Sequence, residues 1–481
     1  MKICGGEKMQ VNLSATGFWK VNNSGKEYAG DLYLNKEEGG IVIYIRIPNS
    51  GAPMSYLELP LEISFIAGST INGGEITLVN CSRISTKSKI GTEEVFGYSA
   101  QFMFSGVKFN KEEDIAFSKM TINIPGIIQW GDVSNYIKSE LEEKKDSFID
   151  LKIIEPIEIY SNETYTVYYH LSFSNPFYFM EEEITLEQKP YLIIDSQSLQ
   201  TIEWFIETAK QMKRLLEIAI GVPLSYGSIS VESPDIYYEF EEGEKHIRPL
   251  EVLHSYKHTL NSELSTKRIT KHDYLFNLSE LKQADFSQWQ EVANKMEPII
   301  ELYIESLYNQ NLSVSRHFLN MVQALETYHS RRIANSLGNY KQRVEELLEI
   351  RPKAFREGDR EFLLGESKKF VTLKGRLADL MIADYRFWFR TGEFRLLEFP
   401  QVIATTRNYY THYDQKLEDK ALKDENLITA FHILRNILEF YLLKEFGFRE
   451  DFIHERIRER IKPIMNSIDI RKADERKNNQ K

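Results

Sequence analysis

Residues Phe399 to Asp414 read FPQVIATTRNYYTHYD and have the spacing of one amphipathic helix. Pro400 suits the first helical turn, where its missing N–H costs no hydrogen bond and its fixed φ is already helical. Side chains suited to packing then recur at helical spacing, at Val402, Ile403, Thr406, Tyr409 and Tyr410. The pattern predicts a helix with one packed face and another face that carries polar side chains.

Three polar side chains of this helix, Arg407, Asn408 and His412, are the candidates for chemistry. Histidine titrates near neutral pH, so it can take a proton from a hydroxyl group. Arginine offers a permanently charged, planar fork that fits the oxygens of a phosphate. Asn408 lies four residues before His412 on the same helical face, where it could orient the ring or donate to a phosphate. This combination suits metal-free cleavage of RNA by its own 2′-hydroxyl.

The spacing of the arginine and the histidine indicates a dimer. They are five positions apart, which places them about 140° apart around the helix and about 7.5 Å apart along it. A single copy would therefore be an awkward site. Two copies that face each other across a twofold axis would bring two arginines and two histidines into one cleft, with one histidine as base and the other as acid.

Two other arginines precede a histidine at a similar distance. The residues next to each arginine therefore have to show which of the three is the best candidate. Arg449 is followed by two carboxylates, which would repel a phosphate, and Arg248 is followed by a proline in an acidic stretch. Arg407 alone is followed by an amide and preceded by an uncharged run. The segment around Arg407 is therefore the favoured site.

An arginine four to six residues before a histidine, with a polar residue after it and on a helix of an all-α bundle, resembles the HEPN ribonucleases. The segment FLNMVQALETYHSRR, from Phe318 to Arg332, and the arrangement of the first half narrow the resemblance to the ApeA type. It implies a dimeric endoribonuclease without cofactor or metal, which leaves 2′,3′-cyclic phosphate ends. The implied setting is anti-phage defence by abortive infection, with RNA as the substrate, tRNA being one candidate, and a phage-derived trigger at the amino-terminal region.

The resemblance also suggests supporting residues. In the ApeA type the Phe318–Arg332 helix packs near the motif helix, so Glu326 is expected to brace Arg407 or His412. Other candidates, either for holding a catalytic side chain in position or for contacting RNA, are His329, Arg331, Arg332 and Tyr410. The alternative interpretation is that the polar side chains of the Phe318–Arg332 helix form an ordinary solvent-exposed face without a role in the site. Three tyrosines of the motif segment could stack on a base or lie in the dimer interface, and the interface is favoured. They are Tyr409, Tyr410 and Tyr413.

Composition is that of a folded protein. With 481 residues, 42% hydrophobic and 12% aromatic, the chain predicts two or three domains and excludes a mostly disordered protein. No apolar run approaches the length of a membrane helix, and the start of the chain lacks the apolar run of a signal peptide, so we expect a cytoplasmic protein. Cys4 and Cys81 have no paired spacing, and three histidines between residues 254 and 272 lack further ligands in register, so no metal site is predicted.

The negative charge lies in the first half of the chain. The formal net charge is −14 over residues 1–280 and +3 over residues 281–481. A nucleic-acid surface is therefore expected in the second half. Because +3 is a small excess, the prediction is a local basic cleft and not a basic face.

The first part of the chain predicts an antiparallel sheet. Short apolar runs broken by Gly, Asn, Ser and Pro extend from Met9 to about Met180, as in a sandwich or barrel. A helix follows between Asp195 and Gly221, with Ser198 as its amino-terminal cap and Gly221 at its end. The runs that we assign to strands are YAGDLYL, GGIVIYIRIP, LELPLEISFIAG, GGEITLVNCS, VFGYSAQFMFSG, KMTINIPG and YTVYYHLSFSNPFYF.

Helices dominate from about Phe286 onward, apart from a charged loop at Arg351–Gly365. The predicted fold class is α+β multidomain, with a β-rich antiparallel amino-terminal region followed by an all-α HEPN helical bundle. The predicted helices, besides the motif helix, are Trp289–Tyr308, Ser313–Arg332, Tyr340–Ile350, Ser367–Phe389, Glu425–Phe446 and Glu450–Met465. The predicted parts are a β-rich domain at 1–190, a helix plus mixed connecting segment at 191–281, a HEPN domain at 282–470 and a charged tail at 471–481.

Two other functions remain open. One is a non-catalytic HEPN module that binds RNA or a nucleotide without cutting it. The other is a component of a toxin–antitoxin pair whose partner is a nucleotidyltransferase. The large amino-terminal region favours self-contained control over the second of these alternatives.

Overall fold

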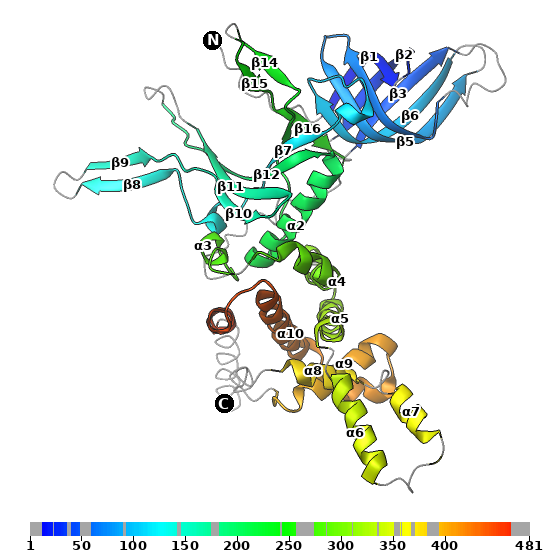
Figure 1. Cartoon of the computed structure of the whole chain (residues 1–481), viewed down its shortest axis with the longest axis vertical. Coiled ribbons are helices and arrows are strands. Elements are labelled where there is room, and N and C mark those ends of the chain that lie inside the picture. The colour runs from blue at the N-terminus through cyan, green and yellow to red at the C-terminus, as the bar shows by residue number, and fades with distance from the viewer. Residues whose placement is uncertain are drawn as a thin grey trace, which may run out of the picture. The chain divides into compact units, whose positions relative to one another are not determined.

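The computed structural model divides into a β-rich unit, residues 1–213 with 224–267, and a helical unit, residues 214–223 with 268–481 (Figure 1). The predicted fold class is therefore confirmed, while the predicted boundaries at 190, 281 and 470 remain predictions. The residues that the structure describes are 12–22, 24–35, 40–48, 59–89, 93–141, 146–174, 182–240, 243–255, 274–284, 286–309, 311–333, 336–350, 356, 358–366, 371–381 and 394–462.

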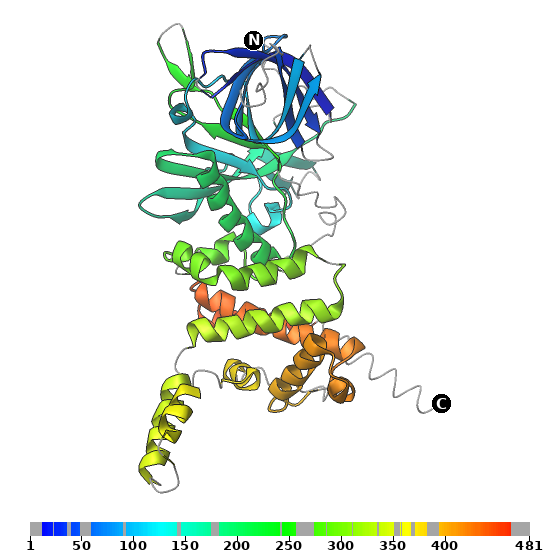
Figure 2. The same cartoon turned by 90° about the vertical axis from the view of Figure 1, so that its right-hand side faces the viewer.

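Six strands of the β-rich unit close into an antiparallel barrel (Figures 1 and 2). Their order is β6-β3-β2-β1-β4-β5, and β5 pairs again with β6, which leaves these strands without a free edge. Along β3 buried side chains alternate with more exposed ones, and Trp19, Ile43 and Phe96 have no exposed area. The strands are β1 (Asn12–Val21), β2 (Glu27–Asn35), β3 (Gly40–Pro48), β4 (Glu62–Thr70), β5 (Glu75–Lys89) and β6 (Glu93–Ser105).

The same sheet continues beyond the barrel, because β16 pairs with the end of β6. The continuation has the order β16-β13-β7-β12-β11-β10. Its strands are β7 (Phe117–Asn123), β10 (Ile157–Ser161), β11 (Tyr165–Phe173), β12 (Gln188–Gln200), β13 (Ile229–Glu232) and β16 (Leu250–His254). Smaller elements are η2 (Glu112–Asp114), α1 (Ile128–Gly131), and two hairpins, β8 (Tyr136–Leu141) with β9 (Asp146–Leu151) and β14 (Tyr237–Glu239) with β15 (Lys245–Ile247).

Helix α2 (Ile202–Ile220) begins later than predicted. Strand β12 runs on to Gln200 because it pairs with its neighbours β11 and β7, so Ser198 lies in a strand and is not the cap. Thr201 takes that place, with its hydroxyl 3.4 Å from the N–H of Trp204. The end of the helix is as predicted, since Gly221 has a φ of +79° and donates its N–H to the Glu217 carbonyl.

The strands β13, β14, β15 and β16 lie in the segment 222–281, where the sequence pattern was mixed. Each is three to five residues long, which is too short for alternation to be recognised. The acidic stretch Tyr237–Lys245 contains the β14–β15 turn, and all six residues of the two strands are exposed.

The helical unit has its core among three long helices, α4, α5 and α10 (Figure 2). Their facing side chains Ile299, Phe318, Leu325, Leu434 and Leu438 have no exposed area. The helices of the unit are α3 (Leu278–Leu281), α4 (Trp289–Tyr308), α5 (Val314–Arg332), α6 (Ser336–Ile350), α7 (Asp359–Glu366), α8 (Leu373–Leu380), α9 (Phe399–His412), η7 (Gln415–Lys420) and α10 (Asp424–Glu445). Residues 450–462 are also helical. None of the helices described combines the length and the apolar character needed to cross a membrane.

Two predictions in the helical unit were wrong in their bounds. The predicted charged loop Arg351–Gly365 contains helix α7, which starts beside Gly358, where φ is +93°. The predicted helix Ser367–Phe389 is shorter, because the Thr372 hydroxyl caps α8 at the Gly375 N–H, at 3.1 Å, and Met381 is already extended. Residues 382–393 lie outside the part of the chain that the structure describes.

Candidate active site

Helix α9 carries the predicted motif at its carboxyl-terminal end. Pro400 stands in the first turn, as expected. Tyr413, directly after the helix, has a φ of +51°, in the left-handed region, and its N–H donates to the Tyr409 carbonyl at 2.6 Å. This backbone conformation ends the helix at His412.

Arg407 is accessible and faces helix α5. Its side chain is 35% exposed, one guanidinium nitrogen donates to Asn408 Oδ1 at 3.2 Å, and another lies 3.9 Å from Glu326 Oε2. An ion pair at this distance and exposure adds little stability. It does restrict where the guanidinium points, so the brace expected from Glu326 agrees in position with the structure, while its role remains a prediction.

His412 and Asn408 are exposed on one side of α9. The His412 ring makes no hydrogen bond or ion pair with any residue that the structure describes. Within one described chain Arg407 and His412 make no contact with each other, as their spacing predicted. A single copy therefore presents a cation and an imidazole on different sides of one helix end.

The segment that follows α9 is fastened back onto it at Leu422. The Leu422 N–H donates to the hydroxyl of the buried Thr406 at 3.1 Å, and the Tyr410 hydroxyl donates to the Leu422 carbonyl at 3.0 Å. Burial raises the pKa of Tyr410, so this hydroxyl stays a donor at neutral pH. These two bonds, which we call the Leu422 clamp, give Tyr410 a structural partner; its predicted contact with RNA remains untested.

The other candidates on α5 have partners inside the helical unit. His329 is 2% exposed, and its Nε2 lies 2.9 Å from Asp379 Oδ2. The ring is therefore not accessible to a ligand from solvent. Arg331 donates to the Lys295 carbonyl at 3.1 Å. Arg332 forms a two-pronged ion pair with Glu445, at 2.9 and 2.5 Å. Direct RNA contact by these arginines is still a prediction, and Arg332 would have to leave a good partner to make it.

The two competing arginines are engaged elsewhere. Arg449 pairs with Asp451, one of the two carboxylates that follow it, at 3.0 Å. Arg248 donates to the Gly106 carbonyl at 2.8 Å, and the His254 ring stacks on a phenylalanine 4.6 Å away. Neither arginine is presented beside an exposed histidine, so the structure adds nothing in their favour.

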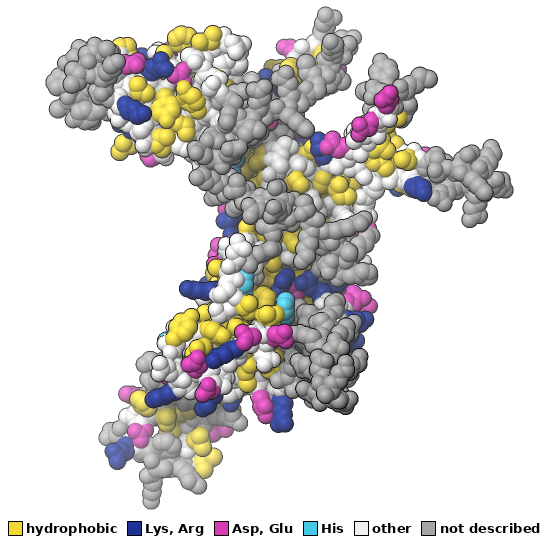
Figure 3. Space-filling view, turned by 180° about the vertical axis from the view of Figure 1, so that it is seen from behind, with side chains coloured by type: hydrophobic (Ala, Val, Ile, Leu, Met, Phe, Trp, Pro, Cys, Tyr) yellow, Lys and Arg dark blue, Asp and Glu magenta, His cyan; other side chains and the backbone are white. Residues whose placement is uncertain are grey.

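Charged side chains of both signs are mixed on the surface of the helical unit, as the face drawn in Figure 3 shows. This agrees with the small net charge of this half, while the local basic cleft remains a prediction. Among the described residues, no group of three or more His, Cys, Asp or Glu side chains could hold a metal ion. His258 and His272 lie outside those residues.

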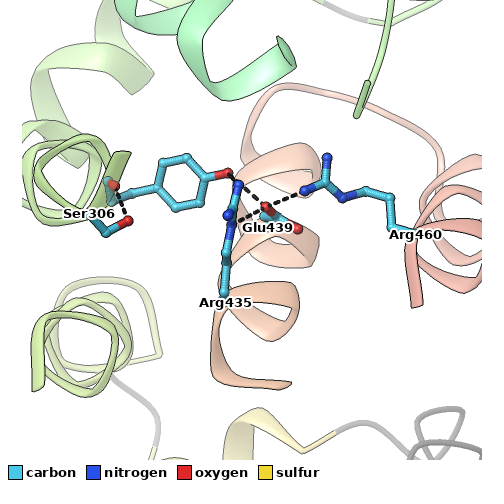
Figure 4. Close-up of polar contacts among 5 residues, drawn as sticks. Ser306, Arg435, Glu439 and Arg460 are labelled. Carbon is cyan, nitrogen blue, oxygen red and sulfur yellow. Dashed lines mark hydrogen bonds and ion pairs between the residues drawn. The ribbon is translucent and has the colours of Figure 1, made fainter. Parts of the chain in front are cut away.

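Sequence reasoning missed a buried ionic cluster in the helical unit (Figure 4). Glu439 has no exposed area, and its Oε1 accepts from Tyr303 at 2.7 Å, Arg435 at 2.9 Å and Arg460 at 3.2 Å. The i, i+4 spacing of Arg435 and Glu439 is a usable signal. Their burial is not visible in the sequence, because it depends on α4 and on the helical residues 450–462 packing against α10.

This cluster fixes the charge states around it. Burial alone would raise the pKa of Glu439, but the two arginines and Tyr303 outweigh it and hold that pKa below its ordinary value. The neighbouring His432 is partly buried, and burial together with Arg435 lowers its pKa to about 4. His432 is therefore neutral at physiological pH, and its ring lies 5.1 Å from that of Phe431, which is the environment of a packing residue.

Comparison with known protein families covers both halves of the chain. Residues 14–289 match the family model described as ApeA N-terminal domain 1, and residues 319–452 match the Apea-like HEPN model, which includes α9 and most of α5. No curated protein and no solved structure matches the chain. HEPN domains are typically ribonuclease domains, and the first match alone spans more than half of the sequence. The chain is therefore an ApeA-type HEPN protein, of the HEPN type that acts in anti-phage defence.

Proposed function

We propose that the protein is a metal-independent endoribonuclease whose active site forms between the HEPN domains of two copies. The observation that carries the proposal is the exposure of Arg407 and His412 at one helix end, where a substrate can reach both side chains. A fold that buried either group in its own core would have left this chemistry without a site. The separation of the two groups within one chain is the reason for a composite site.

The reaction follows from the residue types. His412 takes the proton of the ribose 2′-hydroxyl, whose oxygen then attacks the adjacent phosphorus. His412 of the partner subunit protonates the departing 5′-oxygen, which leaves a 2′,3′-cyclic phosphate and a 5′-hydroxyl. The Arg407 guanidinium holds the phosphate oxygens as negative charge grows on them. Asn408 orients the ring or donates to the phosphate, and Glu326 limits the movement of the guanidinium.

The β-rich unit is proposed as the part that controls the nuclease. In this proposal a phage-derived signal acts on the amino-terminal region, RNA is then cut, and growth of the infected cell stops. The net charge of −14 over residues 1–280 argues that RNA itself does not bind there. The cutting surface therefore belongs to the helical unit.

The test is RNA cleavage in the presence of EDTA, with analysis of the product ends. Arg407→Ala and His412→Ala are each expected to lower kcat by at least 100-fold, because each removes a group that acts in the transition state. Arg449→Ala is the matched control, since this arginine also lies five residues before a histidine and is exposed. Cyclic phosphate ends are expected from the wild-type protein.

Three outcomes would count against the proposal. Activity that disappears with EDTA would point to a metal. Equal losses in the Arg449 control and the motif variants would point to a general loss of structure. RNA binding without cleavage, under conditions that include phage lysate as a source of the trigger, would support the non-catalytic alternative.

A further inference from the structure

Tyr413 presents an aromatic ring directly beside the candidate catalytic histidine. It is 67% exposed, and its φ of +51° lies in a region that side chains other than Gly, Asn and Asp rarely adopt. Single exposed apolar side chains are ordinary on protein surfaces. Tyr413 combines an unfavourable backbone conformation with an exposed ring, next to His412 in the sequence. Unfavourable backbone conformations cluster at active sites and ligand-binding sites, so this ring is a candidate for contact with a ligand.

The ring lies on the His412 side of the helix. Its centroid is 5.8 Å from that of Tyr409, with the ring planes at 65°. Around the helix axis Tyr409 is about 60° from His412, whereas Arg407 is about 140° away. By helix geometry, the Tyr409 side of α9, where the Tyr413 ring lies, is closer to His412 than to the guanidinium of the same chain.

Several contacts fix the backbone around Tyr413. The Leu422 clamp fastens the following segment to α9, and Asp414 Oδ1 accepts the Lys416 N–H at 3.0 Å, which starts η7. Lys416 and Lys420 are exposed and make no ion pair with the residues that the structure describes. The backbone that carries the ring is thus held in place, and two lysines without an ion partner among the described residues follow it along the chain.

We propose that Tyr413 stacks on an unpaired nucleobase beside the scissile phosphate, so that the site takes single-stranded or looped RNA. This inference rests on the proposed ribonuclease function. Bases inside a duplex are already stacked on both faces, so only an unpaired base can offer a face to the ring. The phosphate must reach His412, and a ring one residue away then borders the bound strand. This favours a base as its occupant over the tyrosines of a second copy.

The test compares Tyr413→Gly with Tyr413→Phe. Glycine is the residue best suited to a left-handed position after a helix, so Tyr413→Gly removes the ring without straining the helix end. Phe362→Ala is the matched control, because it deletes another exposed aromatic ring, 65% exposed, on helix α7. The substrates are a 20-nucleotide RNA of mixed sequence, alone and annealed to its complement, and an uncleavable 2′-deoxy version of the same strand.

The wild-type protein is expected to cut the single strand and to spare the duplex. Tyr413→Gly should raise KM for the single strand roughly 5- to 150-fold, the range for loss of one stacked base, with kcat changed less than about threefold. Its affinity for the 2′-deoxy strand should fall by a similar factor. Tyr413→Phe, which keeps the ring, should remain within about twofold of wild type, as should Phe362→Ala.

Two results would overturn the inference. One is that Tyr413→Gly leaves both the KM and the affinity for the 2′-deoxy strand unchanged. The other is that the Tyr413→Gly dimer dissociates in sedimentation velocity, which would place the ring in the dimer interface. Failure of the proposed function looks different. In that case the wild-type protein cuts no RNA, and the 2′-deoxy strand still decides whether Tyr413 binds a base. If the wild-type protein also fails to bind that strand, both proposals fall.

Discussion

At the scale of single residues, the lack of a close acidic partner separates Arg407 and His412 from His329, Arg332 and Arg435 in the helical unit. Arg407 is 35% exposed with a distant carboxylate, and His412 is exposed without a partner among the described residues. His329 and Arg435, in contrast, are held by acidic side chains within the unit. Because a buried charge needs a partner, those groups are committed to the fold. The motif residues remain available to a substrate.

His432 is expected to make the free energy of unfolding depend on pH between about 4 and 6.5. Burial, followed by Arg435, lowers its folded-state pKa from 6.5 to about 4. In this window the unfolded chain binds a proton at His432 and the folded chain does not, so stability is complete above pH 6.5 and falls as the pH drops toward 4. The loss attributable to this residue should reach roughly 2–3 kcal/mol.

Urea denaturation at pH 7.5, 6.0 and 5.0 measures this dependence. His432→Gln should reduce the slope, whereas the exposed His412→Gln serves as the control and should keep it. Glu439 also has a lowered pKa, but the stability it contributes is lost mainly below about pH 4.5, which is under the lowest pH measured. A slope that is identical in wild type and His432→Gln would contradict the assignment.

At the scale of elements, α9 and the segment after it form one structural unit. The left-handed Tyr413 ends the helix, and the Leu422 clamp returns the chain to it before α10 begins. The position of His412 is thereby fixed from both sides. No pattern in the sequence predicts this, because Thr406 and Tyr410 appear there only as members of a packed face.

Removing either half of the Leu422 clamp should destabilise the helical unit measurably. Tyr410→Phe deletes one hydrogen bond and should cost about 1 kcal/mol, whereas Thr406→Val leaves the Leu422 N–H without its acceptor and should cost about 1–3 kcal/mol. Urea denaturation gives both values. Thr411→Val is the control, since the exposed Thr411 hydroxyl bonds only the carbonyl of Arg407 within the helix. Equal effects in all three variants would show that the clamp has no special role.

Element boundaries were predicted well where local signals agreed with packing. Helix α4 has the predicted bounds because an uninterrupted apolar stripe is also its buried face. Helix α2 begins four residues after Ser198 because pairing of β12 with its neighbours outweighs the local preference of a serine for a cap. Helix α7 was missed because a charged, eight-residue helix shows too little periodicity.

At the scale of the whole molecule, the proposed site exists only in a dimer. A single chain holds Arg407 and His412 on different sides of α9, and the net charge of +3 over residues 281–481 gives no broad attraction for RNA. Twofold symmetry would double both groups in one cleft. Activity should then depend on the composition of the dimer.

Mixing wild-type chains with His412→Ala chains tests this directly. If both histidines of a dimer are required, a ninefold excess of the variant should lower the activity per wild-type chain about tenfold after subunit exchange, because few wild-type homodimers remain. If each chain contained a complete site, the activity per wild-type chain would not change. Arg449→Ala chains, added in the same excess, control for effects of exchange itself.

The sequence by itself determined the division into a β-rich first part and a helical second part, most of the long elements, and the motif Arg407-Asn408-His412 on one helix. These features depend on periodicity and spacing, which are local properties of the chain. Only the tertiary structure decided that the barrel closes, that His329 and Glu439 are buried with partners, and that Tyr413 stands exposed beside His412. Each of these depends on segments far apart in the sequence, and burial and strand pairing are set by the neighbours that folding brings together.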